Sequence, residues 1–491
     1  MKIFNKWLVA LMVIATVSCT GDFDEINTND QNPTVVDPGF ILTGVEGSIM
    51  NRYVFTSDLF ANETGSLAQY FVKHFYTNEN VYNFRGSMFN AYWNTYYNQM
   101  LRMREAAKMI ETPPYSLDDE AVKTNRKAVL EILEIWTWTQ ITDQFGDVPY
   151  TNALQGGENF QPTYDTQEAI YTDLIARISS VVTTIDNSAG SFGNSDVIFD
   201  GDMDAWERFA NSLKLRMGMR VIDANSTLGT TAVQEAAATN LISSNAQNVT
   251  YEFQNETFRS PLRRNDGEAA WDDVVIAQTY TDVVNAVEDP RRGFQMYDWG
   301  PGGTFRGFPI SDKSWADLDQ SKWSYSYLGW AFRYWDERAD TQWPYVMMDY
   351  AEVSFLLAEA AERGVITGSA DAYYTQGITA SMEYWDVDPA DVATYLARPD
   401  IVYSSANWKE RIGTQKYIAH FPYGSEAFSE ARRLDFPVLV QPLNGTQTLD
   451  LANRMLYPND EVLLNSENTA AAISRLENGN TLTGKVWWDV N

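Results

Sequence analysis

Apolar residues recur along much of the chain at the spacing of amphipathic helices. Between Asp165 and Ile185 they stand three or four positions apart, for example at Ile170 and Leu174, so that one face of a helix would be apolar. Asp165 and Glu168 have the spacing of an N-terminal capping box at the start of this segment. Four further segments show the same periodicity, residues 121–141, 206–222, 271–287 and 350–363.

The predicted helices fall into pairs joined by short turns. Residues 350–363 and 371–385 are separated by a turn that begins at Gly364, and we expect Leu357 to lie in the core. Large and small residues alternate in this pair as in tetratricopeptide hairpins, although no strict period of about 34 residues runs through the chain. Other candidate pairs are residues 91–110 with 121–141, and 206–222 with 231–243. We expect the aromatic residues at helical spacing to be buried, namely Trp136, Trp138, Trp206, Phe355 and Trp385. The pattern predicts a mainly α fold, a scaffold of tetratricopeptide-like helical pairs.

The pattern changes between residues 255 and 343, where few windows keep a helical or strand period. Gly300–Gly303 reads Gly-Pro-Gly-Gly, and six tryptophans from Trp299 to Trp343 are spread among Tyr, Ser, Asp and Gly. This composition predicts a loop-rich second lobe with short strands at residues 255–345, mounted on the helical scaffold.

The first residues have the pattern of an export signal. Lys2 and Lys6 flank the start of an apolar run from Trp7 to Val17, which is too short to span a membrane but fits the apolar region of a signal peptide. Cys19 follows at the position of the lipidated cysteine in a bacterial lipobox, so we predict a lipoprotein signal peptide at residues 1–18. The alternative is an incidental cysteine in an ordinary signal peptide.

The charge excludes one class of function. The 491 residues include 66 acidic and 36 basic side chains, which gives a formal net charge of -30. Nucleic-acid binding requires a basic face that displaces counterions from phosphates, and the sequence has no cluster of Lys and Arg for one. The 67 aromatic residues instead provide many surfaces for stacking.

Reactive groups are scarce. With only His74, His420 and Cys19, the chain lacks the residues for a His-rich zinc site, a redox pair of cysteines or a disulfide framework. Asp200, Asp202 and Asp204 have the spacing of the start of a calcium loop, but the later positions do not fit one, and we interpret these acids as the cap of the helix that follows. We therefore predict no catalytic residue, no metal and no cofactor.

Several segments resemble the SusD/RagB family of nutrient-binding outer-membrane lipoproteins of Bacteroidetes. The segment from Met347 to Gly364 is similar to a family signature of the form YAEVxFLxAEAAxRG. Further similar segments occur in the expected order: Gln144–Tyr150, Trp206–Arg220, Tyr374–Val387, Ile412–Pro437, Arg454–Glu461 and Lys485–Asp489. The acidic residues 20–25 resemble the tag that follows the lipidated cysteine in surface-exposed lipoproteins of this phylum, or form a solvated linker.

The resemblance implies the organisation of the whole chain. A lipidated linker at residues 19–37 would lead into a SusD-like helical scaffold formed by residues 38–254 and 346–491, with the ligand lobe at residues 255–345. It also implies a partner, a SusC-like TonB-dependent transporter of the outer membrane that the lipoprotein would cover like a lid. The implied function is capture of an oligosaccharide at the cell surface and its delivery to that transporter, without chemistry.

Exposed aromatic rings with polar neighbours suit a glycan, because sugar rings have apolar C–H faces and hydrogen-bonding hydroxyls. Our candidate ligand residues in the second lobe are Trp299, Trp315, Trp323, Tyr325, Tyr327 and Trp330. Tyr82, Phe84 and Trp93 form a candidate second wall. For any one of these residues, packing in a core or contact with the transporter is the alternative.

Two other functions stay open at this point. One is capture of peptides in the manner of RagB. The other is a glycosidase with two facing carboxylates, which the count of acidic residues does not exclude, although no pair stands out.

The lipid anchor gives a direct prediction. Replacing Cys19→Ala should release the protein from the membrane, because no segment after the signal peptide reaches 18 apolar residues. Fractionation of cells that lack the transporter measures this. A variant that stays in washed outer membranes would show that something other than the lipid holds the protein.

Overall fold

Helices form most of the chain, which confirms the mainly α fold. The structure, a computed structural model, describes residues 36–54, 64–85, 87–253, 274–297, 304–318, 321, 324–329 and 343–491. Its α-helices are α3 (Pro38–Val54), α5 (Thr64–Leu67), α6 (Met88–Ile110), α7 (Glu120–Phe145), α8 (Gln167–Val182), α9 (Met203–Val221), α10 (Ser226–Ala237), α11 (Gln278–Ala286), α12 (Arg292–Gln295), α13 (Tyr350–Glu362), α14 (Ala370–Tyr384), α15 (Pro389–Leu396), α16 (Trp408–Ala419), α17 (Gly424–Leu434), α18 (Asn459–Leu464) and α19 (Ser466–Ile473). None of these helices in the described ranges has the length and apolar composition to cross a membrane.

The strands of the described residues are short and pair in twos. Every pair is antiparallel: β1 (Phe71–Lys73) with β5 (Val274–Ile276), β2 (Val148–Pro149) with β3 (Tyr164–Asp165), β4 (Val249–Tyr251) with β8 (Tyr345–Met348), β6 (Met296–Tyr297) with β7 (Tyr327–Leu328), and β9 (Leu443–Asn444) with β10 (Gln447–Thr448). In the first pair Val72 lies opposite Val275. Most of these pairs join distant parts of the chain, so the strands fasten segments together and do not form a layer.

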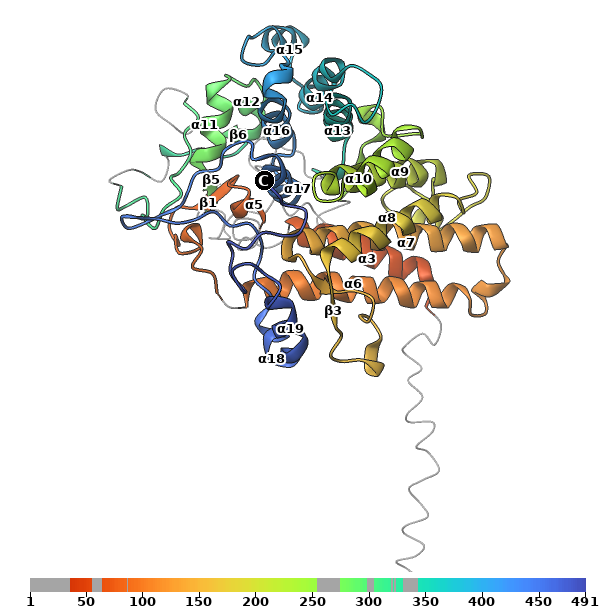
Figure 1. The fold of residues 1–491 in the computed structure, drawn as a ribbon. Coiled ribbons are helices and arrows are strands. Elements are labelled where there is room, and N and C mark those ends of the chain that lie inside the picture. Colours follow the sequence, from red (N-terminus) through yellow and green to blue (C-terminus); the bar gives the residue numbers. More distant parts are fainter. Residues whose placement is uncertain are drawn as a thin grey trace, which may run out of the picture.

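The helices pack in a row of neighbours. In Figure 1, α6 and α7 form a long pair at the lower right, and α8 and α9 lie above them. The pair of α13 and α14 lies near the top of the view, and β1, β5, α11 and α12 lie on the left. The pairs α6 with α7, α9 with α10 and α13 with α14 are those that the sequence predicts, and they confirm the tetratricopeptide-like scaffold. The C-terminus lies near the middle of the view in Figure 1, and its last two residues, Val490 and Asn491, are exposed.

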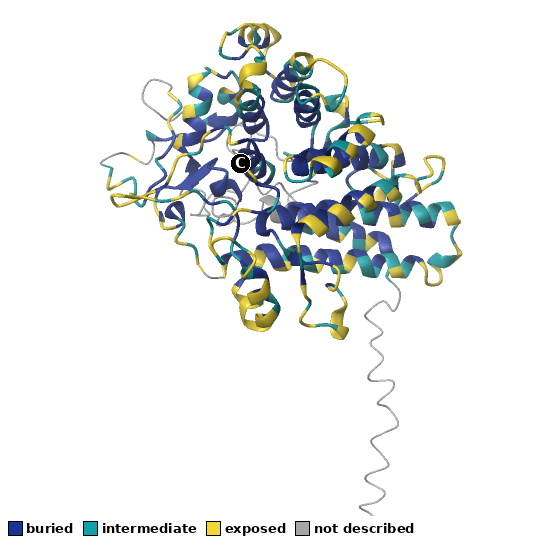
Figure 2. Cartoon of the chain, in the orientation of Figure 1, coloured by how far each residue is buried: buried dark blue, intermediate teal, exposed yellow. Residues whose placement is uncertain are grey.

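Helix α7 is the central element of the scaffold. Asp119 caps its start by accepting a hydrogen bond from the backbone N–H of Ala121 (2.8 Å). From Ile132 to Phe145 every residue is buried, as Figure 2 shows for the inner helices. A helix that is buried on all sides needs partners for its polar side chains, and Glu134 and Asp143 find theirs in neighbouring arginines.

Three predicted helix starts are wrong. The helix predicted at residues 231–243 is α10, which begins at Ser226 and ends at Ala237. Thr166 caps α8, and Asp165 lies in β3, where its carboxylate accepts the backbone N–H groups of Tyr150 and Thr151. The helix predicted from residue 271 begins at Gln278, because Val274–Ile276 pair with β1 as a strand. The interpretation of the acids at residues 200–204 as a helix cap is confirmed at α9, where Asp202 accepts the N–H of Ala205 (3.1 Å).

The hairpin of α13 and α14 depends on two glycines. Gly364 ends α13 with a φ of 68°, and the next N–H, that of Val365, donates back to Ala360 (2.9 Å) in the pattern of a Schellman motif. Gly377 allows α14 to approach α13, because a Cβ atom there would stand 2.7 Å from the ring of Phe355.

The core contains the aromatic residues assigned to it, with one error nearby. Trp136, Trp138, Trp206, Phe355 and Trp385 are all buried. Leu357, however, is partly exposed, and its neighbour Leu356 is fully buried instead. The periodicity therefore predicted that α13 has a buried apolar face, but it assigned Leu357 to that face in place of Leu356.

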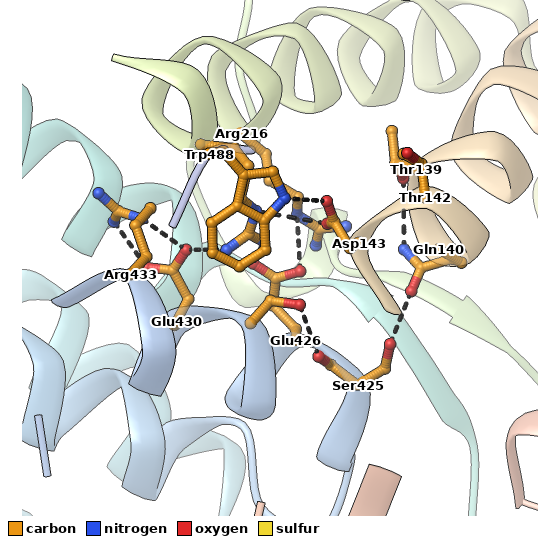
Figure 3. Close-up of polar contacts among 12 residues, drawn as sticks. Thr139, Gln140, Thr142, Asp143, Arg216, Ser425, Glu426, Glu430, Arg433 and Trp488 are labelled. Carbon is orange, nitrogen blue, oxygen red and sulfur yellow. Dashed lines mark hydrogen bonds and ion pairs between the residues drawn. The ribbon is translucent and has the colours of Figure 1, made fainter. Parts of the chain in front are cut away.

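A network of buried ion pairs joins the helices at the centre of the molecule (Figure 3). Arg220 on α9 is buried and donates hydrogen bonds to Glu426 and Glu430 on α17, and it also faces Asp143 on α7. Lys416 on α16 donates to Glu430 at 2.6 Å. One arginine thus connects three helices that are far apart in the sequence.

Arg433 extends this network to α13. It donates to both carboxylate oxygens of Glu359 (2.7 and 2.6 Å) and to both of Glu430 (3.0 and 2.7 Å). Burial alone would raise the pKa of Glu430, but Arg433, Lys416 and Arg220 hold it well below the usual value. Glu359 interrupts the most apolar helix of the sequence, and the structure gives the reason in this bidentate pair.

The C-terminal residues close the network. The indole Nε1–H of Trp488 donates to Asp143 (2.8 Å), and its ring lies against the guanidinium groups of Arg220 (5.2 Å) and Arg432 (4.8 Å). The hydrogen bond of its indole and the two guanidinium groups against its ring hold Trp488 in the interior.

The first stability prediction compares neighbouring leucines of α13. Leu356→Ala should lower the free energy of unfolding by about 2 to 5 kcal/mol, because it empties a fully buried site. Leu357→Ala, the matched control, should cost about 1 kcal/mol or less, since that side chain already contacts water. Urea denaturation of both variants measures the difference, and equal losses would contradict the assigned face.

The second stability prediction concerns Glu430→Gln. This change leaves the buried charges of Arg220, Lys416 and Arg433 without their shared carboxylate, so the free energy of unfolding at neutral pH should fall by about 3 to 5 kcal/mol. Because the pKa of Glu430 is lowered in the folded state, its contribution is present above the ordinary carboxylate pKa and is lost as pH falls below it. The variant should therefore show a flatter acid dependence than the native chain between about pH 5 and pH 2.

Glu111→Gln serves as the control for that experiment. Glu111 forms an exposed pair with Lys127, so its replacement should leave the urea midpoint almost unchanged at neutral pH. Equal losses in the two variants would show that burial of the network does not determine its strength.

Candidate ligand-binding site

A second, smaller core supports one end of the molecule. It is formed by side chains of β1, β5, β7 and the chain around residue 308: Val72, Val275, Ala277, Phe308, Ile310, Tyr325 and Tyr327. Backbone hydrogen bonds hold these segments in register, with Phe308 N–H donating to Ile276 and Ile276 N–H donating to Ser326. The described segments that form this core are therefore held together by backbone hydrogen bonds as well as by packing.

The loop after β1 carries two exposed aromatic residues. Phe75 and Tyr76 expose 55% and 65% of their surfaces, and their ring centroids are 4.9 Å apart at an interplanar angle of 81°. The loop is closed by Asn80, whose side chain accepts the N–H of Lys73 (2.9 Å) and donates to its carbonyl (2.6 Å). Aromatic surface of this extent in solvent, on a loop fixed by buried hydrogen bonds, indicates a binding surface.

Trp315 lies beside this pair. Its backbone N–H donates to the carbonyl of His74 (2.9 Å), and Thr77 donates to the carbonyl of Asp312 (2.8 Å). The Trp315 side chain packs against the smaller core and remains partly exposed. We call Phe75, Tyr76 and Trp315 the aromatic surface.

Polar residues flank Trp315 in the sequence. Ser314 donates its N–H and its hydroxyl to the carboxylate of Asp317 (2.9 and 2.7 Å), and these bonds hold the pKa of Asp317 below its usual value. Lys313 is exposed next to them. Exposed aromatic rings together with hydrogen-bonding side chains nearby in the sequence suit the C–H faces and hydroxyls of a sugar.

Three of the predicted ligand residues are buried instead of exposed. Tyr325 (1% exposed) and Tyr327 (3%) belong to the smaller core, where the hydroxyl of Tyr327 lies 3.2 Å from Nε2 of His74. Trp93 (4% exposed) points into the main core between Phe145 and Tyr457. These rings alternate with polar residues in the sequence, as a binding loop would, but here they face inward and support the loops.

Tyr82 and Phe84 occupy an intermediate position. Both are partly buried against the main core, with ring centroids 6.0 Å apart. Burial raises the pKa of Tyr82 to about 12, and its hydroxyl oxygen accepts the N–H of Ala452 (3.4 Å). Their contact with ligand stays a prediction.

Some predicted residues lie outside the described part of the chain. They are Trp299, Trp323 and Trp330 in the second lobe and Cys19 at the N-terminus. The boundaries predicted for the second lobe also stay a prediction, although its described part holds three short strands and the helices α11 and α12.

Phe75 and Tyr76 are not among the ligand residues predicted from the sequence. The signal was present, because the two aromatics stand in the polar stretch Lys73–Asn80. The same pattern, aromatic residues among polar ones, is the basis for the ligand residues predicted between 299 and 330, where aromatics are denser.

The scaffold carries a separate hollow. A cavity of about 750 Å³ lies between α6, α7 and α8, with Met103, Ala107 and Leu130 among its apolar lining. Arg104 and Arg177 on its wall are already bound to Glu134, at 2.9 and 3.3 Å. Lys108 and Lys127 in its lining are also paired, with Glu105 and Glu111, so the charged groups of the cavity wall already have partners within the protein.

One buried cluster has the residue types of a metal site. Glu352, His420 and Glu426 bring ligand atoms within 4.8 Å of one another. Arg216 donates to both oxygens of Glu352 (2.6 and 2.5 Å), and Arg220 donates to Glu426, whose pKa falls to about 2 although burial opposes the shift. Because guanidinium groups already neutralise both carboxylates, a divalent cation would meet repulsion there.

His420 in this cluster is buried. Burial lowers its pKa, and within the described residues its Nε2 atom has no hydrogen-bond partner. The cavity beside it is about 30 Å³, the size of a single water molecule. These features give His420 a packing role in the core.

Comparison with known proteins places the chain among glycan-binding relatives of the outer membrane. Residues 30–458 match a SusD-like family described as starch-binding and associating with the outer membrane. A comparison with curated proteins gives no match.

Solved structures share the fold over nearly the whole chain. A SusD homologue from Parabacteroides distasonis has a TM-score of 0.80 at 21% identity, covering 93% of this chain and 98% of its own. A SusD homologue from Bacteroides uniformis has a TM-score of 0.77 at 24% identity, with 92% and 99% covered. A chitin-binding SusD homologue from Flavobacterium johnsoniae has a TM-score of 0.77 at 22% identity, with 92% and 99% covered. At these identities the likeness establishes the fold.

Proposed function

We propose, from the premise that this chain belongs to the SusD/RagB family, that it captures oligosaccharides at the cell surface and delivers them to a SusC-like TonB-dependent transporter. The observation that carries this proposal is the aromatic surface. Phe75 and Tyr76 present exposed rings on a fixed loop, and the backbone of Trp315 is hydrogen-bonded to that loop at His74.

The charge of the chain favours a neutral glycan. A protein with a net charge of -30 repels polyanions at long range, so uronic-acid or sulfated polymers would approach it poorly. Starch is named for the family and chitin for one of the structural neighbours, and both are neutral polymers. Malto-oligosaccharides and chito-oligosaccharides are therefore the first probes.

The anchor and the partner belong to the same proposal. Lipidation at Cys19 would hold the chain at the outer membrane, which is where the family description places its members. Binding without chemistry suits such a carrier, because a ligand must leave unchanged for the transporter.

Two alternatives remain distinguishable by experiment. Peptide capture would use the same exposed rings, and a peptide panel tested beside the glycans separates it from our proposal. A glycosidase would release new reducing ends from the glycans during incubation, and such turnover would exclude a binding role alone.

The site prediction is a paired measurement of affinity and stability. Tyr76→Ala and Trp315→Ala should each weaken oligosaccharide binding by roughly one to two decades, the size of about 1 to 3 kcal/mol of lost stacking. Tyr76→Ala should leave the melting temperature almost unchanged, because 65% of that residue is exposed. Isothermal titration calorimetry and thermal denaturation measure the two effects.

Phe40→Ala is the matched control for that experiment. Phe40 is 72% exposed on α3, away from β1 in the fold, so its replacement should change neither property. Unchanged affinity in the Tyr76 and Trp315 variants, with a bound oligosaccharide in the native chain, would place the site elsewhere.

A further inference from the structure

Three large apolar side chains are exposed together at the edge of the scaffold. Phe160 is 81% exposed, and Leu463 and Leu464 at the end of α18 are 76% and 71% exposed. Single exposed apolar residues are common on protein surfaces, but a group of them in one place usually marks an interaction site.

Amide side chains bind the two segments to each other. Gln161 donates to the carbonyl of Leu464 (2.8 Å), Asn465 donates to the carbonyl of Pro162 (2.8 Å), and Asn468 donates to the carbonyl of Gln161 (3.0 Å). Segments about 300 residues apart in the sequence are thereby fixed side by side. An apolar group on a rigid backbone loses little entropy when it is covered, as interface anchors require.

The charge around these residues selects the kind of partner. Residues 151–163 and 456–474 contain no Lys or Arg, whereas Glu158, Asp460, Glu461 and Glu467 are acidic. Arg475, which follows, is paired with Asp147 at 2.6 Å. Surfaces that bind lipid headgroups are rich in Lys and Arg, so an anionic membrane surface would repel this one. A protein with an apolar socket and a basic rim would attract it.

The position agrees with a partner in the membrane. In Figure 1 α18, α19 and the loop before β3 project from the same side of the molecule on which α3 begins, and Figure 2 shows α18 and that loop as exposed. Residue 36 precedes α3 and is 17 residues after Cys19, which at full extension spans at most about 60 Å. A chain lipidated at Cys19 would thus keep this side within reach of proteins embedded in the membrane.

We propose that Phe160, Leu463 and Leu464 form a docking surface, which we call the α18 patch, for the transporter. This inference rests on the proposed function and adds to it the surface of contact and its chemistry. The patch inserts apolar side chains into a socket of the transporter, and the acidic groups around it pair with basic groups at the rim of that socket.

The test uses the full-length lipidated protein in its native outer membrane. The triple variant Phe160→Ser, Leu463→Ser, Leu464→Ser is extracted in mild detergent, and the TonB-dependent transporter that co-purifies is identified and quantified by mass spectrometry. Co-purification should fall roughly tenfold or more, while the melting temperature and the affinity for oligosaccharide stay at native values, because the three side chains lie in solvent.

Leu117→Ser is the matched control. Leu117 is 82% exposed after α6, outside the patch, and its replacement should leave co-purification unchanged. Equal recovery of the transporter with the triple variant would overturn the patch while leaving the proposed function intact. Absence of any transporter from the native preparation would instead count against the proposed partner and the patch together, and binding of the unlipidated chain to phosphatidylglycerol vesicles through these residues would also overturn the inference.

Discussion

The buried ion pairs around Arg220 and Glu430 are the constraint on which the scaffold depends. Removing such charges from water costs several kcal/mol for each ion, and only complete pairing offsets this cost. Here the carboxylate of Glu430 accepts hydrogen bonds from Arg220, Lys416 and Arg433, which come from α9, α16 and α17. The helices cannot shift relative to one another without leaving a charge unpaired in the interior.

This network also explains the position of the chain's end. Trp488 reaches the centre of the molecule because Asp143 accepts its indole N–H and two arginines face its ring. Val486 and Trp488 near the end of the chain therefore take part in the core. The segments that resemble the family meet here, since Arg220, Glu359, Glu430 and Trp488 all come from them.

A rigid scaffold lets exposed loops carry recognition. The aromatic surface is held in place by short strands and by hydrogen bonds of Asn80 and Thr77. The rings of Phe75 and Tyr76 contribute little to the cores below, whereas Trp315 packs against the smaller core. The α18 patch is built in the same way, from side chains in solvent on a backbone fixed by amides. Changes in ligand or partner can arise at both surfaces with little effect on folding.

The sequence by itself determined the helical pairs, the apolar faces and the burial of residues such as Trp136 and Trp206, because these follow from local periodicity. It also marked where aromatics gather among polar residues, and so pointed to Trp315. Only the tertiary structure decided which aromatics face water. Tyr325 and Trp93 are buried and Tyr76 is exposed, because burial depends on which distant segment covers a ring, and pairings such as β1 with β5 are not encoded in local spacing. For the same reason Glu359, an interruption in an apolar helix when read along the chain, became a partner of Arg433 only when α13 and α17 came together.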